Sequence, residues 1–121
     1  MLHEDQDIVL ERQARLCQAL ADTKRLRLLH ALGTQERSVS ELAALIGASQ
    51  SNTSQHLALM RDIGLVAPRR MGTVIYYHLA YPRILEACSV VENIVRQQLL
   101  EGALLVGAST GRVPGSRQSD Q

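Results

Sequence analysis

Seven consecutive residues in the middle of the chain carry uncharged polar side chains: Gln50-Ser51-Asn52-Thr53-Ser54-Gln55-His56. Amide and hydroxyl groups match the donor and acceptor patterns that base edges present in a DNA major groove, and Gln and Asn suit adenine. An ordinary solvent-facing helix is rich in Lys and Glu, but no charged residue lies between Gln50 and Met60. The alternative is a plain solvent-exposed surface. The predicted base contacts are Gln50, Ser51, Asn52, Thr53, Gln55 and His56.

Basic residues on both sides of this run supply the charge that it lacks. Residues 23–83 hold eight basic and three acidic residues, a net charge of +5, whereas the whole chain carries only +1. This concentration suits a polyanion, although a solvated surface is the alternative. The predicted phosphate contacts are the backbone amides near Ser38 and Ser40, Lys24 or Arg25, Arg61, and the paired Arg69 and Arg70.

Helical spacing and capping residues predict five helices that position these side chains. Asp22 and Ser49 are good N-cap residues, and Ser38 with Glu41 forms a capping box. Glycines follow several of the apolar runs and mark where the helices end. The expected helices cover residues 7–21, 23–32, 38–46, 50–63 and 82–101, with Gly102 ending the last one.

Two short β-rich runs, residues 65–67 and 74–77, flank a basic segment with Gly72 at or near its turn. Two short helices joined by a three-residue turn that contains glycine, followed by a basic hairpin, are the parts of a winged helix-turn-helix. We expect a mostly α (α+β) fold of this type, with five helices and a two-stranded β-hairpin wing.

Length and composition fit one globular domain. The chain has 121 residues, of which 45% are hydrophobic and 21% charged, and aromatic residues make up only 2%. We expect a flexible acidic arm over residues 1–7, a domain over residues 8–101 and a flexible tail over residues 102–121. Neither a basic leader segment nor an apolar stretch of about 20 residues is present, so we expect a cytoplasmic protein with no membrane partner.

Four motifs in order resemble the ArsR/SmtB family of bacterial metal- and redox-sensing repressors, over roughly residues 8–100. They are the run from Leu20 to Leu29, Ser38-Val39-Ser40-Glu41-Leu42-Ala43, Gln50 to Leu57, and Gly64-Leu65-Val66. The resemblance implies a homodimer built from the first and last helices, which binds a near-palindromic operator in double-stranded DNA and releases it when an inducer acts. The apolar residues Val91, Val95 and Leu99 agree with such a dimer, although a stripe buried within one chain is the alternative.

The metal sites known in this family are missing from the sequence. The thiolate pair of some members falls on Ser38 and Ser40, and hydroxyls do not replace thiolates for soft metals. The start of the zinc site on the last helix falls on Tyr81 and Arg83, with no His following on that helix. The cysteines that other members carry in the recognition helix fall near Ala58 and Asp62.

Cys17 and Cys88 remain as sensor candidates. In the fold that the resemblance implies, their helices lie against one another, so the two thiols could approach within one chain or across the dimer. A disulfide or polysulfide bridge, or capture of a soft metal or metalloid, would then clamp the helices. The alternative is that both cysteines are small core residues and the repressor has no cysteine-based sensing.

The competing function is a winged-helix module that binds another protein instead of DNA. An enzyme is disfavoured, because the sequence lacks a Gly-rich phosphate loop with Lys, a set of metal ligands, and a nucleophile with a recognisable general base.

Overall fold

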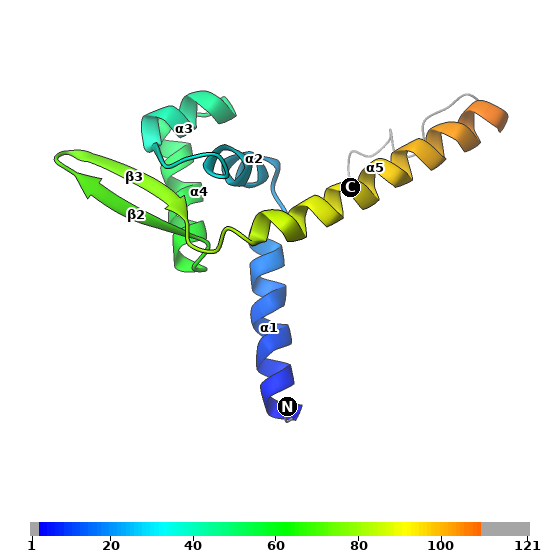
Figure 1. The fold of residues 1–121 in the computed structure, drawn as a ribbon, viewed down its shortest axis with the longest axis horizontal. Helices are drawn as coiled ribbons and strands as arrows, with labels where there is room; N and C mark the ends of the chain where they lie inside the picture. Colours follow the sequence, from blue (N-terminus) through cyan, green and yellow to red (C-terminus); the bar gives the residue numbers. More distant parts are fainter. Residues whose placement is uncertain (1–2, 110–121) are drawn as a thin grey trace. The chain divides into compact units, whose positions relative to one another are not determined.

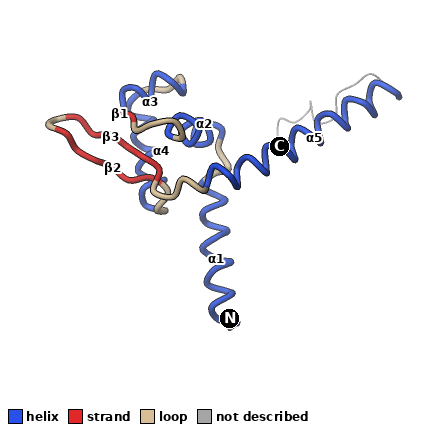
Figure 2. The backbone as a smooth tube through the Cα atoms, viewed as in Figure 1, coloured by secondary structure: helices blue, strands red, loops and turns tan. Residues whose placement is uncertain are grey.

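The computed structural model describes residues 3–109, and the backbone forms five helices and three short strands within that range (Figure 1 and Figure 2). The chain divides into two compact units at Pro82, and each is described by itself. The elements are α1 His3–Ala19, α2 Thr23–Leu32, β1 Arg37–Ser38, α3 Val39–Ile46, α4 Gln50–Asp62, β2 Val66–Met71, β3 Val74–Leu79 and α5 Ile84–Ser109. The expected winged helix-turn-helix with five helices is confirmed.

The outer boundaries differ from those expected. The predicted flexible arm is helical from His3, because α1 begins there with Glu4 and Asp5 in its first turn, where acidic side chains favour a helix. Gly102 does not end the last helix, and α5 continues to Ser109. The rest of the predicted tail, residues 110–121, lies outside the described residues, as do Met1 and Leu2.

The capping residues act as expected. The Asp22 carboxylate accepts hydrogen bonds from the backbone amides of Lys24 and Arg25 and starts α2. Ser38 and Glu41 exchange two hydrogen bonds at the start of α3, which is a complete capping box. Ser49 accepts from the Asn52 amide and starts α4. Each cap fixes the first turn of a helix that the functional surface uses.

The sheet has one strand more than expected. β1 pairs with β3, which pairs with β2, and both pairings are antiparallel. Met71 lies opposite Val74, so residues 72–73 form a two-residue turn, with Gly72 at a φ of 62° in its first position. A positive φ at this position suits a type II′ turn and favours glycine. The tip of the hairpin of β2 and β3 extends away from α2, α3 and α4 (Figure 2).

The core of the first unit lies between α2, α3, α4 and the base of the sheet. Its fully buried apolar side chains are Leu28, Leu29, Leu42, Leu57, Met60 and Leu65. Every one of these residues is aliphatic or Met, as the shortage of aromatic residues requires. This core therefore holds α3 and α4 in a fixed relation.

The described part of the second unit consists of the single helix α5. No helix among residues 3–109 is both long and apolar enough to cross a membrane.

Candidate nucleic-acid interface

The helix-turn-helix consists of α3, the turn at residues 47–49, and α4. Gly47 adopts the left-handed conformation, with φ 69° and ψ 42°, and ends α3. The Ala48 amide donates to the Ala43 carbonyl at 3.0 Å, and Ser49 then caps α4. The tight turn thereby sets the direction in which α4 leaves the core.

The α4 helix has one apolar face and one polar face. Thr53, Leu57 and Met60 are buried, at positions four and three residues apart. The polar side chains on the opposite side are exposed at Gln50, Ser51, Ser54 and Gln55. Four neutral side chains with donors and acceptors therefore cover the first turns of α4, as a helix that reads a major groove requires.

Thr53 does not fit its predicted role as a base contact. Its residue exposure is 0%, and its hydroxyl donates to the Ser49 carbonyl at 2.8 Å. Ser54, which the sequence-based prediction left out, is exposed instead. The apolar spacing contains the information to place both, because Thr53 lies four residues before Leu57 and seven before Met60 and so shares their buried face.

Asn52 and His56 lie one helical turn apart at the edge of the polar face, and both are half-buried. The Asn52 Oδ1 atom is buried and has no hydrogen-bond partner among the described residues. The His56 Nδ1 atom lies 3.2 Å from Nη1 of Arg25, at the start of α2. The edge of α4 that carries these two residues therefore contacts α2.

Arg25 and Lys24 were alternative phosphate contacts, and the structure distinguishes them. The Arg25 Nε atom donates to the Ala19 carbonyl at the end of α1, while Nη1 contacts His56. Lys24 forms no ion pair with any residue in the range 3–109. Burial would raise the pKa of the Asp22 carboxyl, but hydrogen bonds from the Arg25 and Lys24 amides and the Arg25 charge hold that pKa below its ordinary value.

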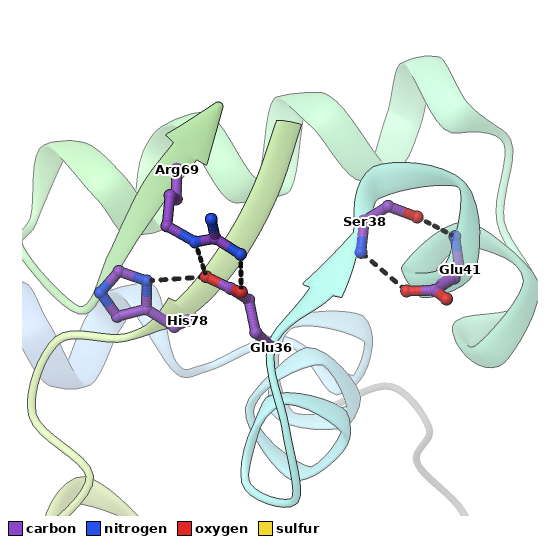
Figure 3. A network of polar contacts seen from close by, with 5 residues as sticks. All are labelled: Glu36, Ser38, Glu41, Arg69 and His78. Carbon is purple, nitrogen blue, oxygen red and sulfur yellow. Dashed lines mark hydrogen bonds and ion pairs between the residues drawn. The ribbon is translucent and has the colours of Figure 1, made fainter. Parts of the chain in front are cut away.

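The acidic side chain of Glu41 restricts one of the predicted phosphate contacts near α3. The Ser38 amide donates to Oε1 of Glu41 at 2.9 Å, so it is already bonded, and a carboxylate lies beside it (Figure 3). Ser40 is exposed in the first turn of α3, where helix amides lack intrahelical acceptors. Of the two serines, Ser40 has the surroundings better suited to a phosphate.

Arg69 is engaged by a second acidic side chain, Glu36. Its Nε and Nη2 atoms donate to the two Glu36 oxygens at 2.9 Å and 2.5 Å, and its guanidinium carbon lies 5.7 Å from the centre of the Tyr76 ring opposite. The His78 Nδ1 atom lies 3.7 Å from the same carboxylate, so both wing strands point a side chain at Glu36 (Figure 3).

This ion pair shifts the pKa of both partners. The Arg69 hydrogen bonds lower the pKa of the Glu36 carboxyl, and Glu36 raises the pKa of the Arg69 guanidinium. The positive charge that the hairpin was expected to offer at Arg69 is therefore largely balanced within the protein.

Arg70 is the next residue on β2 and lies on the opposite face of the hairpin, because side chains alternate along a strand. It is exposed and forms no ion pair with any residue in the described range. Arg61, in the last turn of α4, forms an ion pair with its neighbour Asp62 at 3.4 Å and with no other residue from 3 to 109, and both side chains are exposed. Arg70 and Arg61 are thus the predicted cations whose positive charge remains most accessible.

The sensor candidates lie in different units. Cys17 is exposed near the end of α1, and Cys88 is half-buried near the start of α5. Among the described residues, no three His, Cys, Asp or Glu side chains come together in a group that could bind a metal ion.

A helix-turn-helix with a neutral polar second helix and a cationic wing defines the class of winged helix-turn-helix DNA-binding proteins. Residues 22–67 match the family model described as bacterial regulatory protein, arsR family. The chain belongs to the arsR family and is a DNA-binding transcriptional regulator, so the resemblance found in the sequence is confirmed. This family consists of regulators and not enzymes.

Relatives cover most of the chain. An uncharacterized HTH-type transcriptional regulator of Mycobacterium tuberculosis is 36% identical over 72% of this chain and 77% of its own length. Nodulation protein NolR of Rhizobium meliloti is 37% identical over 76% of this chain and 72% of its own length. A solved structure of a homodimeric winged helix-turn-helix DNA-binding domain from Mycobacterium bovis, a possible ArsR-family regulator, has a TM-score of 0.72, 30% identity, and coverage of 81% and 91% of the two chains.

Proposed function

We propose that this chain is a cytoplasmic, homodimeric repressor that binds a near-palindromic operator and releases it when an inducer acts. The observation that carries the proposal is the exposed neutral face of α4, formed by Gln50, Ser51, Ser54 and Gln55. A protein that bound DNA only through charge would need Lys and Arg on this face. Neutral donors and acceptors add little to phosphate binding but discriminate between base edges.

Contacts with phosphate come from outside α4's polar face. Arg70 on the wing, Arg61 at the end of α4, Lys24 at the start of α2 and the exposed first turn of α3 at Ser40 provide them. Arg69 contributes less, because Glu36 already accepts its hydrogen bonds. The proposed interface therefore separates base reading by α4 from attachment by its surroundings.

The dimer is proposed from the exposed apolar side chains of α5. Val91, Val95 and Leu99 are 59%, 44% and 60% exposed and follow one another at intervals of four residues, so they line one side of the helix. The described part of this unit contains no second element to cover them. A second copy of the chain would cover them, and the M. bovis domain of similar structure is homodimeric. Two copies would present two α4 helices to an operator with matching half-sites.

The proposal is tested with an operator selected from a random duplex library by the full chain. We expect Gln55→Ala and Ser54→Ala to weaken binding to this operator much more than binding to a random duplex. Gln35→Ala is the matched control, because Gln35 is an exposed glutamine outside α4, and it should change neither. Equal losses on the two duplexes for both α4 variants would contradict base reading by α4.

The dimer is tested by the mass in solution. We expect twice the 13.3 kDa of one chain, and a shift toward the monomer for Val95→Glu, because this change places a charge in the proposed interface. A wild-type mass of one chain at the concentrations that bind DNA would refute the dimer.

For the inducer, we propose an action on the thiols of Cys17 and Cys88. Cys17 is exposed within its chain, so packing in the core of one subunit does not explain its presence. With a peroxide as oxidant, two thiols give one disulfide and the peroxide is reduced to two waters, while a soft metalloid such as arsenite would bind both as thiolates. Either event would link α1 to α5 and change the relation of the two α4 helices.

The thiol proposal is tested by measuring operator binding with reduced protein, with peroxide or polysulfide, and with arsenite or cadmium. We expect one of these treatments to release wild-type protein, and Cys17→Ser and Cys88→Ser to abolish that response while they keep DNA binding. Response curves that are identical for the wild type and both variants would contradict it.

A further inference from the structure

The Arg25 guanidinium connects three helices that are separate in the sequence. Its Nε atom donates to the carbonyl of Ala19, which ends α1, and its Nη1 atom contacts Nδ1 of His56 in α4 at 3.2 Å. Its own backbone amide is held by Asp22, the N-cap of α2. The side chain is therefore fixed by the protein from both sides, which is unusual for a residue that would bind phosphate.

The contact with His56 determines where the imidazole carries its proton. A guanidinium has only hydrogen-bond donors, and it stays protonated. The Nδ1 atom of His56 must therefore accept this hydrogen bond, so in the neutral ring the proton is on Nε2. The two ring nitrogens lie on different sides of the ring, so Nε2 points away from Arg25 and remains for a ligand.

A ring in this state can only donate from its outward nitrogen. The neighbouring serine and glutamine side chains of α4 both donate and accept, so they tolerate either kind of base edge. A fixed donor can form a hydrogen bond to purine N7, guanine O6 or thymine O4, which are acceptors. It cannot form one with the amino groups of adenine and cytosine, which are donors. His56 is half-buried at the edge of the exposed face, one turn after Asn52, where such a contact could form.

We propose that Arg25 is a positioning residue that holds His56 as a donor to one acceptor on a base edge in each half-site, and that Arg25 itself does not bind phosphate. This inference rests on the proposed function, because it assumes that α4 lies in the major groove. It replaces the prediction of a phosphate contact at Arg25 and leaves that role to Lys24.

The first test uses the free protein. In full-length chain labelled with ¹⁵N-histidine, at a pH where His56 is neutral, we expect a pyridine-type shift at Nδ1 of His56 and a pyrrole-type shift at Nε2. Arg25→Gln should mix the two tautomers, whereas Lys24→Gln should leave them unchanged. A wild-type ring with its proton on Nδ1 would overturn the inference whatever the DNA measurements show.

The second test compares the selected operator with random duplex. Loss of one neutral hydrogen bond costs about fivefold in affinity, so His56→Ala should cost about 25-fold over two half-sites on the operator. Arg25→Gln leaves about half of the rings in the donor tautomer, so it should cost about twofold per half-site, or about fourfold, on the operator and almost nothing on random DNA. His56→Ala should relax the preference at the same single base pair of each half-site, and the double variant should lose no more than His56→Ala alone. Lys24→Gln, the control, should weaken binding to both duplexes.

Two failures of this test are distinguishable. If the wild-type chain does not discriminate between operator and random duplex, the proposed function fails. If it discriminates, but Arg25→Gln lowers the affinity for both duplexes equally and reduces the salt dependence of binding, then Arg25 is a phosphate contact and this inference alone is wrong.

Discussion

The two adjacent arginines of the wing should behave differently toward DNA. The Arg69 guanidinium donates two hydrogen bonds to Glu36, whereas Arg70 has no such partner among residues 3–109. Arg70→Gln should therefore remove a phosphate contact, and Arg69→Gln should remove a charge that the protein already balances. Because the residues are neighbours on one strand, each variant is the matched control of the other.

The size of the effect follows from counterion release. Each phosphate contact contributes about 0.9 to the slope of log affinity against log salt, so the loss of Arg70 from two subunits lowers the slope by about 1.8. Between 50 and 200 mM salt, a fourfold change, wild-type affinity should then fall about 12 times more than that of Arg70→Gln. Arg69→Gln should keep the wild-type slope.

Fluorescence anisotropy of a labelled operator at four or more salt concentrations measures these slopes. A third variant tests the cause: Glu36→Gln removes the carboxylate that engages Arg69, so in the Arg70→Gln background it should restore part of the lost slope. A drop for Arg69→Gln equal to that for Arg70→Gln would refute the reasoning, because Arg69 would then leave Glu36 for phosphate at no cost.

Three further predictions concern stability and are read by urea unfolding. Thr53→Ala should cost about 2 kcal/mol, since a buried hydroxyl and methyl group are lost, yet leave operator affinity of the folded protein unchanged; weaker operator binding with unchanged stability would contradict the buried position. Gly47→Ala should lower the free energy of unfolding by about 1 kcal/mol because of its φ of 69° alone, since an added Cβ meets nothing within 4 Å. Gly33→Ala, at φ −69°, should leave the free energy of unfolding unchanged. Equal losses for the two variants would argue against conformational strain at Gly47. The pKa of Asp22 is lowered on folding, so the stabilisation by its charge is complete above its unfolded pKa and disappears as the pH falls through its folded pKa. Below about pH 4 the wild type should therefore lose more stability than Asp22→Asn, which keeps the cap. Parallel curves of stability against pH would show that the Asp22 charge contributes nothing.

Local interactions made much of this fold predictable from the sequence. A capping box involves residues three apart, and the Ser38–Glu41 box forms as expected. The glycine stops at Gly47 and Gly64 both adopt positive φ. In each of these places the residues that decide the structure are within one turn of one another, so no knowledge of the tertiary fold is needed.

The prediction for α4 identified the polar run correctly but was wrong about which side of the helix Thr53 and Ser54 lie on. Six of the seven residues of the polar run were predicted to contact bases, and Ser54 was left out, although the apolar positions at Leu57 and Met60 determine which side of the helix is buried. Applied strictly, this spacing puts Thr53 inside and Ser54 outside. The sequence therefore contained the correct surface, and neglect of this spacing concealed it.

The contacts of the arginines could not be predicted in this way. Glu36 and Arg69 are separated by 33 residues, and Arg25 and His56 by 31, so each pair depends on how the elements pack. The strand β1, only two residues long, likewise forms because β3 is available to pair with it. A count of basic residues treats all arginines as equivalent, but their partners give them different roles.

These partners divide the eight basic residues in the middle of the chain into two kinds. Glu36 engages Arg69, and His56 and the Ala19 carbonyl engage Arg25. The Ala31 carbonyl and the Thr34 hydroxyl engage Arg37, so at least three of these cations form hydrogen bonds within the protein. An interface with fewer accessible cations depends less on charge and more on the neutral groups of α4. It should therefore bind random DNA weakly, and that is the condition under which a small set of base contacts can direct a regulator to its operator.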